Sequence, residues 1–316
     1  MQETLVIAIG GNAILKEGQR GTAEEQYANV KACCGPIVDL YAQGYRLVLV
    51  HGNGPQVGNI LLQAEAAADT VAPQPIDLCG AQTQGQIGYM IQRAVHNMFL
   101  EKGIDGKITS VVTQVVVDPN DPAFQDPTKP IGPFYTKERA EALQQEHPEA
   151  VFKEDAGRGW RRVVASPKPL RIIEKGSANA LLQQGHIVVT GGGGGIPIAV
   201  DGNRYTGVEA VVDKDLVSAI VARDVNASKL VILTGVDQVF VDFGKPTQRP
   251  IDRMSAEQAR AYMAEGQFPP GSMKPKIEAA LGYLEQGGRE VLITSIEKLA
   301  QALAGESGTI IFRSEV

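Results

Sequence analysis

The sequence predicts an α/β protein with a mostly parallel central sheet and helices on both faces of that sheet. Short apolar runs typical of buried strands alternate with amphipathic stretches typical of helices along most of the 316 residues. Glycine-rich turns separate the two kinds of segment, and the 35 glycines and 18 prolines form no repeat. A regular order of strand, glycine turn and helix is typical of a parallel sheet covered by helices.

The N-terminal strands and the helix between them are clearly marked. Continuous apolar runs predict two buried strands at residues 5–9 and 47–50. Thr22 and Glu25 have the spacing of a capping box at the start of the intervening helix. We expect Gly44 to end this helix and Pro36 to kink or shorten it.

The C-terminal half repeats the pattern, and one segment in the middle interrupts it. Further strands are predicted at 187–190, 230–233, 290–294 and 309–312. A helix is expected from about Ser295, and the run 108–117 resembles one long strand. The proline-rich segment that follows, residues 118–166, is too long for a structureless loop in a compact domain. We interpret it as an inserted subdomain that acts as a lid, and we call it the inserted segment.

Composition excludes several classes of protein. A net charge of −6 argues against a nucleic-acid partner, which would require a basic face. The N-terminus has no signal-peptide pattern, and no apolar run approaches the length of a membrane span, so we expect a cytoplasmic protein. Three cysteines and four histidines show no metal-binding spacing, and the cysteines are expected to be reduced thiols. His51 ends a predicted strand and precedes a glycine turn. It is either a catalytic base or a residue that orients this turn.

Three glycine turns at predicted strand ends are candidate anion sites. They lie at residues 10–12, 52–54 and 191–195. Such turns offer backbone N–H groups and lead to helix N-termini, which favour negative charge. The common nucleotide motifs are absent, including the P-loop and the dinucleotide fingerprint. Asp242-Phe-Gly244 matches the metal-binding triplet of protein kinases, but the companion motifs are missing and the match is due to chance.

Three lysines stand in restrained surroundings. Lys129 lies in a proline-rich stretch, Lys214 lies between two aspartates before an apolar helix, and Lys276 follows a proline at a predicted helix start. In a chain of negative net charge, an anion site must gather positive charge locally. These lysines are the candidates for that charge. With the glycine turns, they favour phosphoryl transfer between an adenine nucleotide and a very small acid.

At these motifs the sequence resembles the carbamate kinases of the amino-acid kinase superfamily, over essentially its whole length. The matching segments are residues 9–13, 51–58, 84–90, 129–135, 161–167, 192–197, 212–216, 271–273 and 275–276. The resemblance implies a three-layer sandwich formed by a single domain of residues 1–316. It places carbamate and the transferred phosphoryl group in a lobe of about residues 1–220, and the nucleotide in a lobe of about 221–316.

The resemblance also implies reversible transfer between ATP and carbamate, with the usual direction toward ATP synthesis. The implied catalytic residues are Lys129, Lys214, Asp215 and Lys276. The implied substrate-binding residues are Gly10, Gly11, Asn12, Gly52, Asn53 and Gly54. The implied nucleotide-binding residues are Gly193, Gly194, Thr234, Met273 and Lys276.

Further expectations follow from the same resemblance. Mg²⁺ enters with ATP or ADP, no prosthetic group is needed, and the protein forms a homodimer. Many superfamily members have a lysine in the first strand that is absent here, and Lys129 resembles its substitute. Gly191, Gly235 and Gln238 depart from the residues common in the family. Two alternatives remain: another small-acid kinase of the superfamily, or a catalytically weak protein that binds nucleotide or carbamoyl phosphate.

Overall fold

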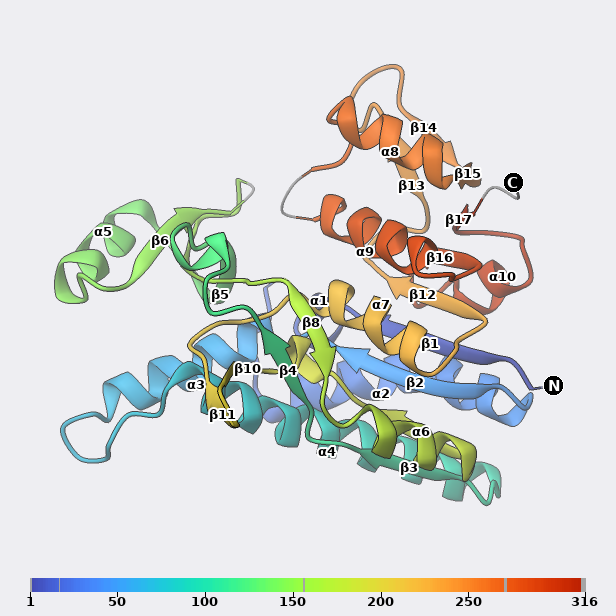
Figure 1. Ribbon diagram of the computed structural model, residues 1–316, viewed down its shortest axis with the longest axis horizontal. Helices are drawn as coiled ribbons and strands as arrows, with labels where there is room; N and C mark the ends of the chain where they lie inside the picture. Colours follow the sequence, from blue (N-terminus) through green and yellow to red (C-terminus); the bar gives the residue numbers. More distant parts are fainter. Residues whose placement is uncertain (1, 17, 156, 270–271, 314–316) are drawn as a thin grey trace.

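An eight-stranded sheet forms the centre of the computed structural model, which describes residues 2–16, 18–155, 157–269 and 272–313 (Figure 1). In spatial order the strands are β15 (Arg253–Ser255), β17 (Thr309–Phe312), β16 (Glu290–Thr294), β12 (Lys229–Leu233), β1 (Thr4–Ile9), β2 (Arg46–His51), β9 (His186–Val189) and β3 (Lys107–Ser110). All neighbouring strands are parallel except β16 and β17. The predicted mostly parallel sheet is therefore confirmed.

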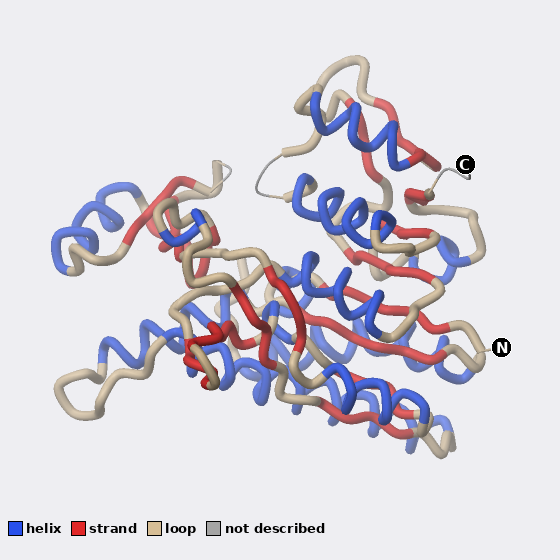
Figure 2. The backbone as a smooth tube through the Cα atoms, in the orientation of Figure 1, coloured by secondary structure: helices blue, strands red, loops and turns tan. Residues whose placement is uncertain are grey.

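Helices cover both faces of this sheet, as Figure 2 shows. On β1, Val6 and Ala8 join the core beneath one helical layer, whereas Leu5 and Ile7 join the core on the opposite face. The first layer contains α6 (Lys175–Gln183), α7 (Lys214–Asp224), α8 (Ala256–Ala264) and α9 (Lys274–Glu285). The second layer contains α1 (Gly11–Ile14), α2 (Ala23–Ala42), α4 (Ile76–Lys102) and α10 (Leu299–Leu303). A strand buried on both faces explains why β1 is apolar from Leu5 to Ile9.

The remaining strands form smaller sheets beside the central one. A four-stranded sheet has the order β11 (Arg204–Gly207), β10 (Ile196–Asp201), β4 (Gln114–Val117) and β8 (Pro169–Ile172). A two-stranded sheet contains β13 (Val239–Val241) and β14 (Arg249–Ile251). The prediction of one strand over 108–117 is wrong, because β3 and β4 belong to different sheets. Between them the backbone N–H of Thr113 donates to the side chain of Gln84, so the chain leaves the central sheet there.

The inserted segment has its own three-stranded sheet and protrudes from the body (Figure 1). It contains η1 (Pro122–Phe124), β5 (Lys129–Tyr135), α5 (Lys137–Glu146), β6 (Val151–Glu154) and β7 (Trp160–Val164). It touches the body at α3 (Gly54–Ala66), where a Cβ on Gly58 would lie only 2.0 Å from the backbone nitrogen of Gly132. An ion pair of 2.5 Å joins Arg162 to Glu65 near this contact.

Two expectations about helices need correction, and one is confirmed. The capping box of Thr22 and Glu25 is present at the start of α2. Pro36 does not shorten α2, because buried residues after it pack into the core and offset the missing hydrogen bond. The last helix begins at Leu299 rather than near Ser295, since the side chain of Ser295 forms a turn by accepting from the N–H of Lys298.

Candidate active site

A cavity of about 570 Å³ opens at the carboxyl ends of β1, β2 and β12. The chain passes from β1 to β2 on one side, whereas β12 pairs with β1 on the other side. Connections that diverge from one strand leave a crevice at its carboxyl end, where ligands of α/β proteins bind. The volume is that of a small-molecule site.

Two glycine turns form the floor of this cavity. A Cβ on Gly52 would lie 2.8 Å from the backbone nitrogen of Gly11, so the turns after β1 and β2 touch directly. These turns begin α1 and α3, and neither N-cap residue, Gly10 or Asn53, makes a side-chain capping bond. The first N–H groups of both helices are therefore available to an anion.

The third glycine turn, residues 191–195, packs against the second glycine turn, residues 52–54. Gly193 lines the cavity with φ +66°, and a Cβ there would lie 2.2 Å from Asn53 Nδ2. Asn53 in turn donates to Thr83 Oγ1 at 2.8 Å. Gly194 does not line the cavity, because it lies against the carbonyl oxygen of Val212, 2.0 Å from where its Cβ would be.

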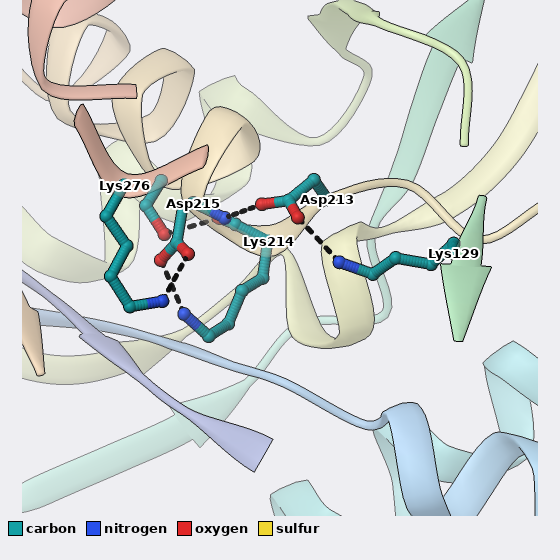
Figure 3. A network of polar contacts seen from close by, with 6 residues as sticks. Lys129, Asp213, Lys214, Asp215 and Lys276 are labelled. Carbon is teal, nitrogen blue, oxygen red and sulfur yellow. Dashed lines mark hydrogen bonds and ion pairs between the residues drawn. The ribbon is translucent and has the colours of Figure 1, made fainter. Parts of the chain in front are cut away.

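Two lysines meet at one carboxylate beside the glycine turns. Lys214 Nζ lies 2.5 Å from Asp215 Oδ1, and Lys276 Nζ lies 3.1 Å from Asp215 Oδ2. Figure 3 shows the two ammonium groups converging on Asp215 from α7 and α9. Since α7 and α9 pack against each other, the core fixes the distance between the two lysines.

The third lysine reaches the site from the inserted segment. Lys129, the first residue of β5, places Nζ 2.5 Å from Asp213 Oδ2 (Figure 3). The other oxygen of Asp213 accepts from the backbone N–H of Asp215 at 2.8 Å, so Asp213 is the N-cap of α7. Sequence reasoning assigned no role to Asp213, although an aspartate directly before a predicted helix is an N-cap signal.

Neighbouring charges outweigh burial at three of the four ionisable groups in this cluster, whereas burial prevails at Lys214. Burial would raise the pKa of Asp215, but Lys214 and Lys276 outweigh burial and hold this pKa well below its ordinary value. Burial lowers the pKa of Lys214. For Lys276, burial is outweighed by Asp215, which raises the pKa. Burial of Asp213 is outweighed in the same way by Lys129, so its pKa is lowered.

The cavity is locally positive although the chain is acidic. Its described lining carries six lysine or arginine side chains against four carboxylates. The additional cations are Lys16, Arg158 and Arg161, and the sequence analysis missed all three. Arg161 donates to the carbonyl oxygen of Gly132 and to Asp155, so it braces the inserted segment from within.

His51 lies behind the second glycine turn and does not line the cavity. It is almost completely buried, and Nδ1 is 3.1 Å from the carbonyl oxygen of Gly52. Burial lowers its pKa to about 4, so the imidazole is neutral near pH 7. This geometry favours the interpretation of His51 as a residue that orients the turn.

The remaining predicted site residues are divided between the cavity and its surroundings. Thr234 lines the cavity, whereas Met273 does not and packs against the core at the start of α9. The side chain of Asn12 lies outside the described residues. Of the three residues that depart from those common in the family, Gly235 lines the cavity. The side chain of Gln238 donates a hydrogen bond to Asp252, away from the cavity.

Cysteine, metal and membrane features are limited. Cys33 lines the cavity, but burial raises its pKa to about 11, and all three cysteines are free thiols. In the part of the chain that the structure describes, no three histidine, cysteine or acidic side chains are grouped to hold a metal. None of the described helices has both the length and the apolar character needed to cross a membrane.

Comparisons with known proteins agree with this geometry. Residues 3–295 match the model of the amino acid kinase family. A carbamate kinase-like protein of Escherichia coli K12, YahI, is 50% identical, covering 99% of this chain and all of that protein. A carbamate kinase of Pyrococcus furiosus is 44% identical over 98% of this chain and 99% of its own.

Solved structures give the same result. A carbamate kinase from Giardia lamblia bound to citric acid superimposes with a TM-score of 0.95 at 40% identity, with 99% of each chain covered. The same enzyme bound to AMP-PNP gives a TM-score of 0.90 at the same identity and coverage. These likenesses extend over the whole chain, including the inserted segment.

Proposed function

The chain belongs to the amino acid kinase family, and within it to the carbamate kinases, and we propose that it transfers a phosphoryl group reversibly between ATP and carbamate. The products are ADP and carbamoyl phosphate, and we expect the usual direction to be ATP synthesis. The observation that supports this best is the Lys214–Asp215–Lys276 cluster beside two touching glycine turns.

This cluster suits the reaction chemically. A carbamate oxygen is already anionic near pH 7, so its attack on phosphorus needs no strong general base. The transferring phosphoryl group spreads negative charge over its oxygens, and catalysis depends on positioning and on fixed positive charge. Lys214 and Lys276 supply that charge, while Asp215 holds their ammonium groups in place. The neutral, buried His51 has no part in proton transfer.

We assign the two ends of the cavity to the two substrates. Carbamate and the transferred phosphoryl group lie against the turns at 10–12 and 52–54, where backbone N–H groups face the cavity. The nucleotide lies toward Thr234 and Gly235, at the carboxyl end of β12. The AMP-PNP-bound relative supports nucleotide use by this fold. In this scheme Lys129 from the inserted segment neutralises the phosphoryl oxygens from the side opposite Lys276.

Mg²⁺ enters as part of the nucleotide substrate. The carboxylates of Asp213 and Asp215 are each committed to lysines, which leaves them poorly placed as metal ligands. Mg²⁺ on nucleotides commonly takes most of its ligands from phosphate and water. We therefore expect the requirement for Mg²⁺ to follow the nucleotide concentration.

One assay tests the proposal and separates the alternatives. Purified protein is supplied with carbamoyl phosphate and Mg·ADP, and ATP formation is measured by a coupled reaction. ATP formation at a turnover of about 1 s⁻¹ or more supports the proposal. Nucleotide binding without turnover would indicate a catalytically weak binding protein. Turnover with another small acyl phosphate, but not with carbamoyl phosphate, would indicate a different acid kinase. Light scattering tests the expected homodimer.

A further inference from the structure

Asp213 contacts both the inserted segment and the helix that bears the catalytic lysine and aspartate. Its Oδ2 is 2.5 Å from Lys129 Nζ, and its Oδ1 accepts from the backbone N–H of Asp215. The side chain is only 15% exposed, and its position is set by the first turn of α7. Asp213 is therefore a fixed point at which a lysine of the inserted segment meets the body.

We propose that Asp213 is a positioning residue that holds Lys129 over the phosphoryl site before substrate arrives. This inference rests on the proposed function. An ammonium group has three N–H donors, and Asp213 engages one of them, so two remain for phosphoryl oxygens. The carboxylate thus orients the lysine without using up its capacity to bind the transferring group.

Lys129 needs such an anchor more than the other two lysines do. It has a flexible side chain that is 27% exposed, and it begins a strand of the inserted segment. Free lysine side chains sample many rotamers, and this freedom opposes a single productive position. The described contacts of the inserted segment with α3, at Gly132 and Arg162, lie at other residues and do not fix the ammonium group.

The competing explanation is that Asp213 only caps α7. Two variants separate the roles, because asparagine and serine are both good N-cap residues but lack the negative charge. We expect Asp213→Asn and Asp213→Ser to keep a native thermal transition and to lower kcat about 10- to 100-fold, with the KM for Mg·ADP nearly unchanged. Wild-type kcat in both variants would overturn the proposal.

A double-mutant cycle tests whether Asp213 acts through Lys129. In a Lys129→Ala background, Asp213→Asn should change kcat by less than about twofold, since the lysine that it positions is gone. An equal loss in both backgrounds would show that Asp213 acts by another route and would overturn the proposal.

A readout independent of activity completes the test. Acetic anhydride labelling of Lys129, followed by mass spectrometry, should rise about threefold or more in Asp213→Asn because the ion pair no longer shields the amine. Unchanged labelling would contradict the proposal. The matched control is Asp126→Asn, which breaks an exposed pair with Lys153 of 2.6 Å elsewhere in the inserted segment and should alter neither kcat nor Lys129 labelling. If the wild-type protein is inactive, the proposed function is wrong. The labelling of Lys129 does not depend on activity, so it still tests whether Asp213 shields the amine.

Discussion

Three of the lysines that line the cavity, Lys129, Lys214 and Lys276, are held in two different ways. Lys214 and Lys276 come from packed helices of the body, and both bind the almost fully buried Asp215. Lys129 comes from a protruding three-stranded sheet, and it binds Asp213 through a side chain that is 27% exposed. The body side of the site therefore holds its two lysines at one buried carboxylate, and we call this side the fixed half. The inserted segment contributes the third lysine from outside the body.

The largest expected effect comes from breaking the fixed half. Asp215→Asn removes the charge that both buried lysines share, so we expect kcat to fall about 1000-fold or more. The free energy of unfolding should fall by about 3–5 kcal/mol, because buried ammonium groups lose their partner. Steady-state kinetics and urea unfolding measure the two effects. The control Asp39→Asn breaks an exposed pair with Lys102 and should change the free energy of unfolding by less than about 1 kcal/mol.

Removing the lysine of the inserted segment should lower activity more than stability. Lys129→Ala should lower kcat about 100- to 1000-fold, because one positive group no longer faces the phosphoryl oxygens. The thermal midpoint should fall by less than in Asp215→Asn, because only one ammonium group is lost and Asp213 keeps its hydrogen bond from the backbone N–H of Asp215. If this variant unfolded as easily as Asp215→Asn, the distinction between the fixed half and the lysine of the inserted segment would be wrong.

The contact between the glycine turns offers a test of the fixed half without any change of charge. In Gly52→Ala the new Cβ would lie 2.8 Å from the nitrogen of Gly11, so the two turns must separate. We expect kcat to fall about 100-fold through misplacement of the substrate by roughly 1 Å. Gly80→Ala is the control, because a Cβ there meets nothing within 4 Å. That variant should keep full activity and gain about 0.5–1 kcal/mol of stability from better helix propensity.

The sequence predicted local features of this molecule better than connections between segments. The continuous apolar runs identified most strands of the central sheet because strands buried on both faces must be apolar along their whole length. The same reasoning misled at 108–117, because β3 and β4 follow one another in one run rich in β-branched residues but belong to different sheets. Pro36 was expected to kink or shorten its helix, but the helix continues past it because packing of the following residues outweighs the propensity of one residue.

For the site, sequence motifs identified lysines but not their partners. Lys129, Lys214 and Lys276 stood out by their surroundings, yet the pairing of Lys129 with Asp213 joins residues 84 positions apart. Such a contact depends on how the inserted segment lies against the body, which no local pattern encodes. Arg161 was missed for the same reason, since its partners in the inserted segment become neighbours only after folding.

The smallest expected effect is a pH dependence of the free energy of unfolding that arises from His51, behind a glycine turn of the fixed half. Folding lowers the pKa of His51 from its ordinary 6.5 to about 4. Between these values the unfolded chain binds a proton here that the folded chain does not, so stability falls as pH falls and the loss ends near pH 4. At pH 5 the loss is about 2 kcal/mol relative to pH 7.5. His51→Asn should lack this part of the acid sensitivity in urea unfolding at both pH values, whereas the exposed His96→Asn should retain it. An unchanged acid sensitivity in His51→Asn would mean that other groups cause it, and that folding does not keep the imidazole of His51 from binding a proton.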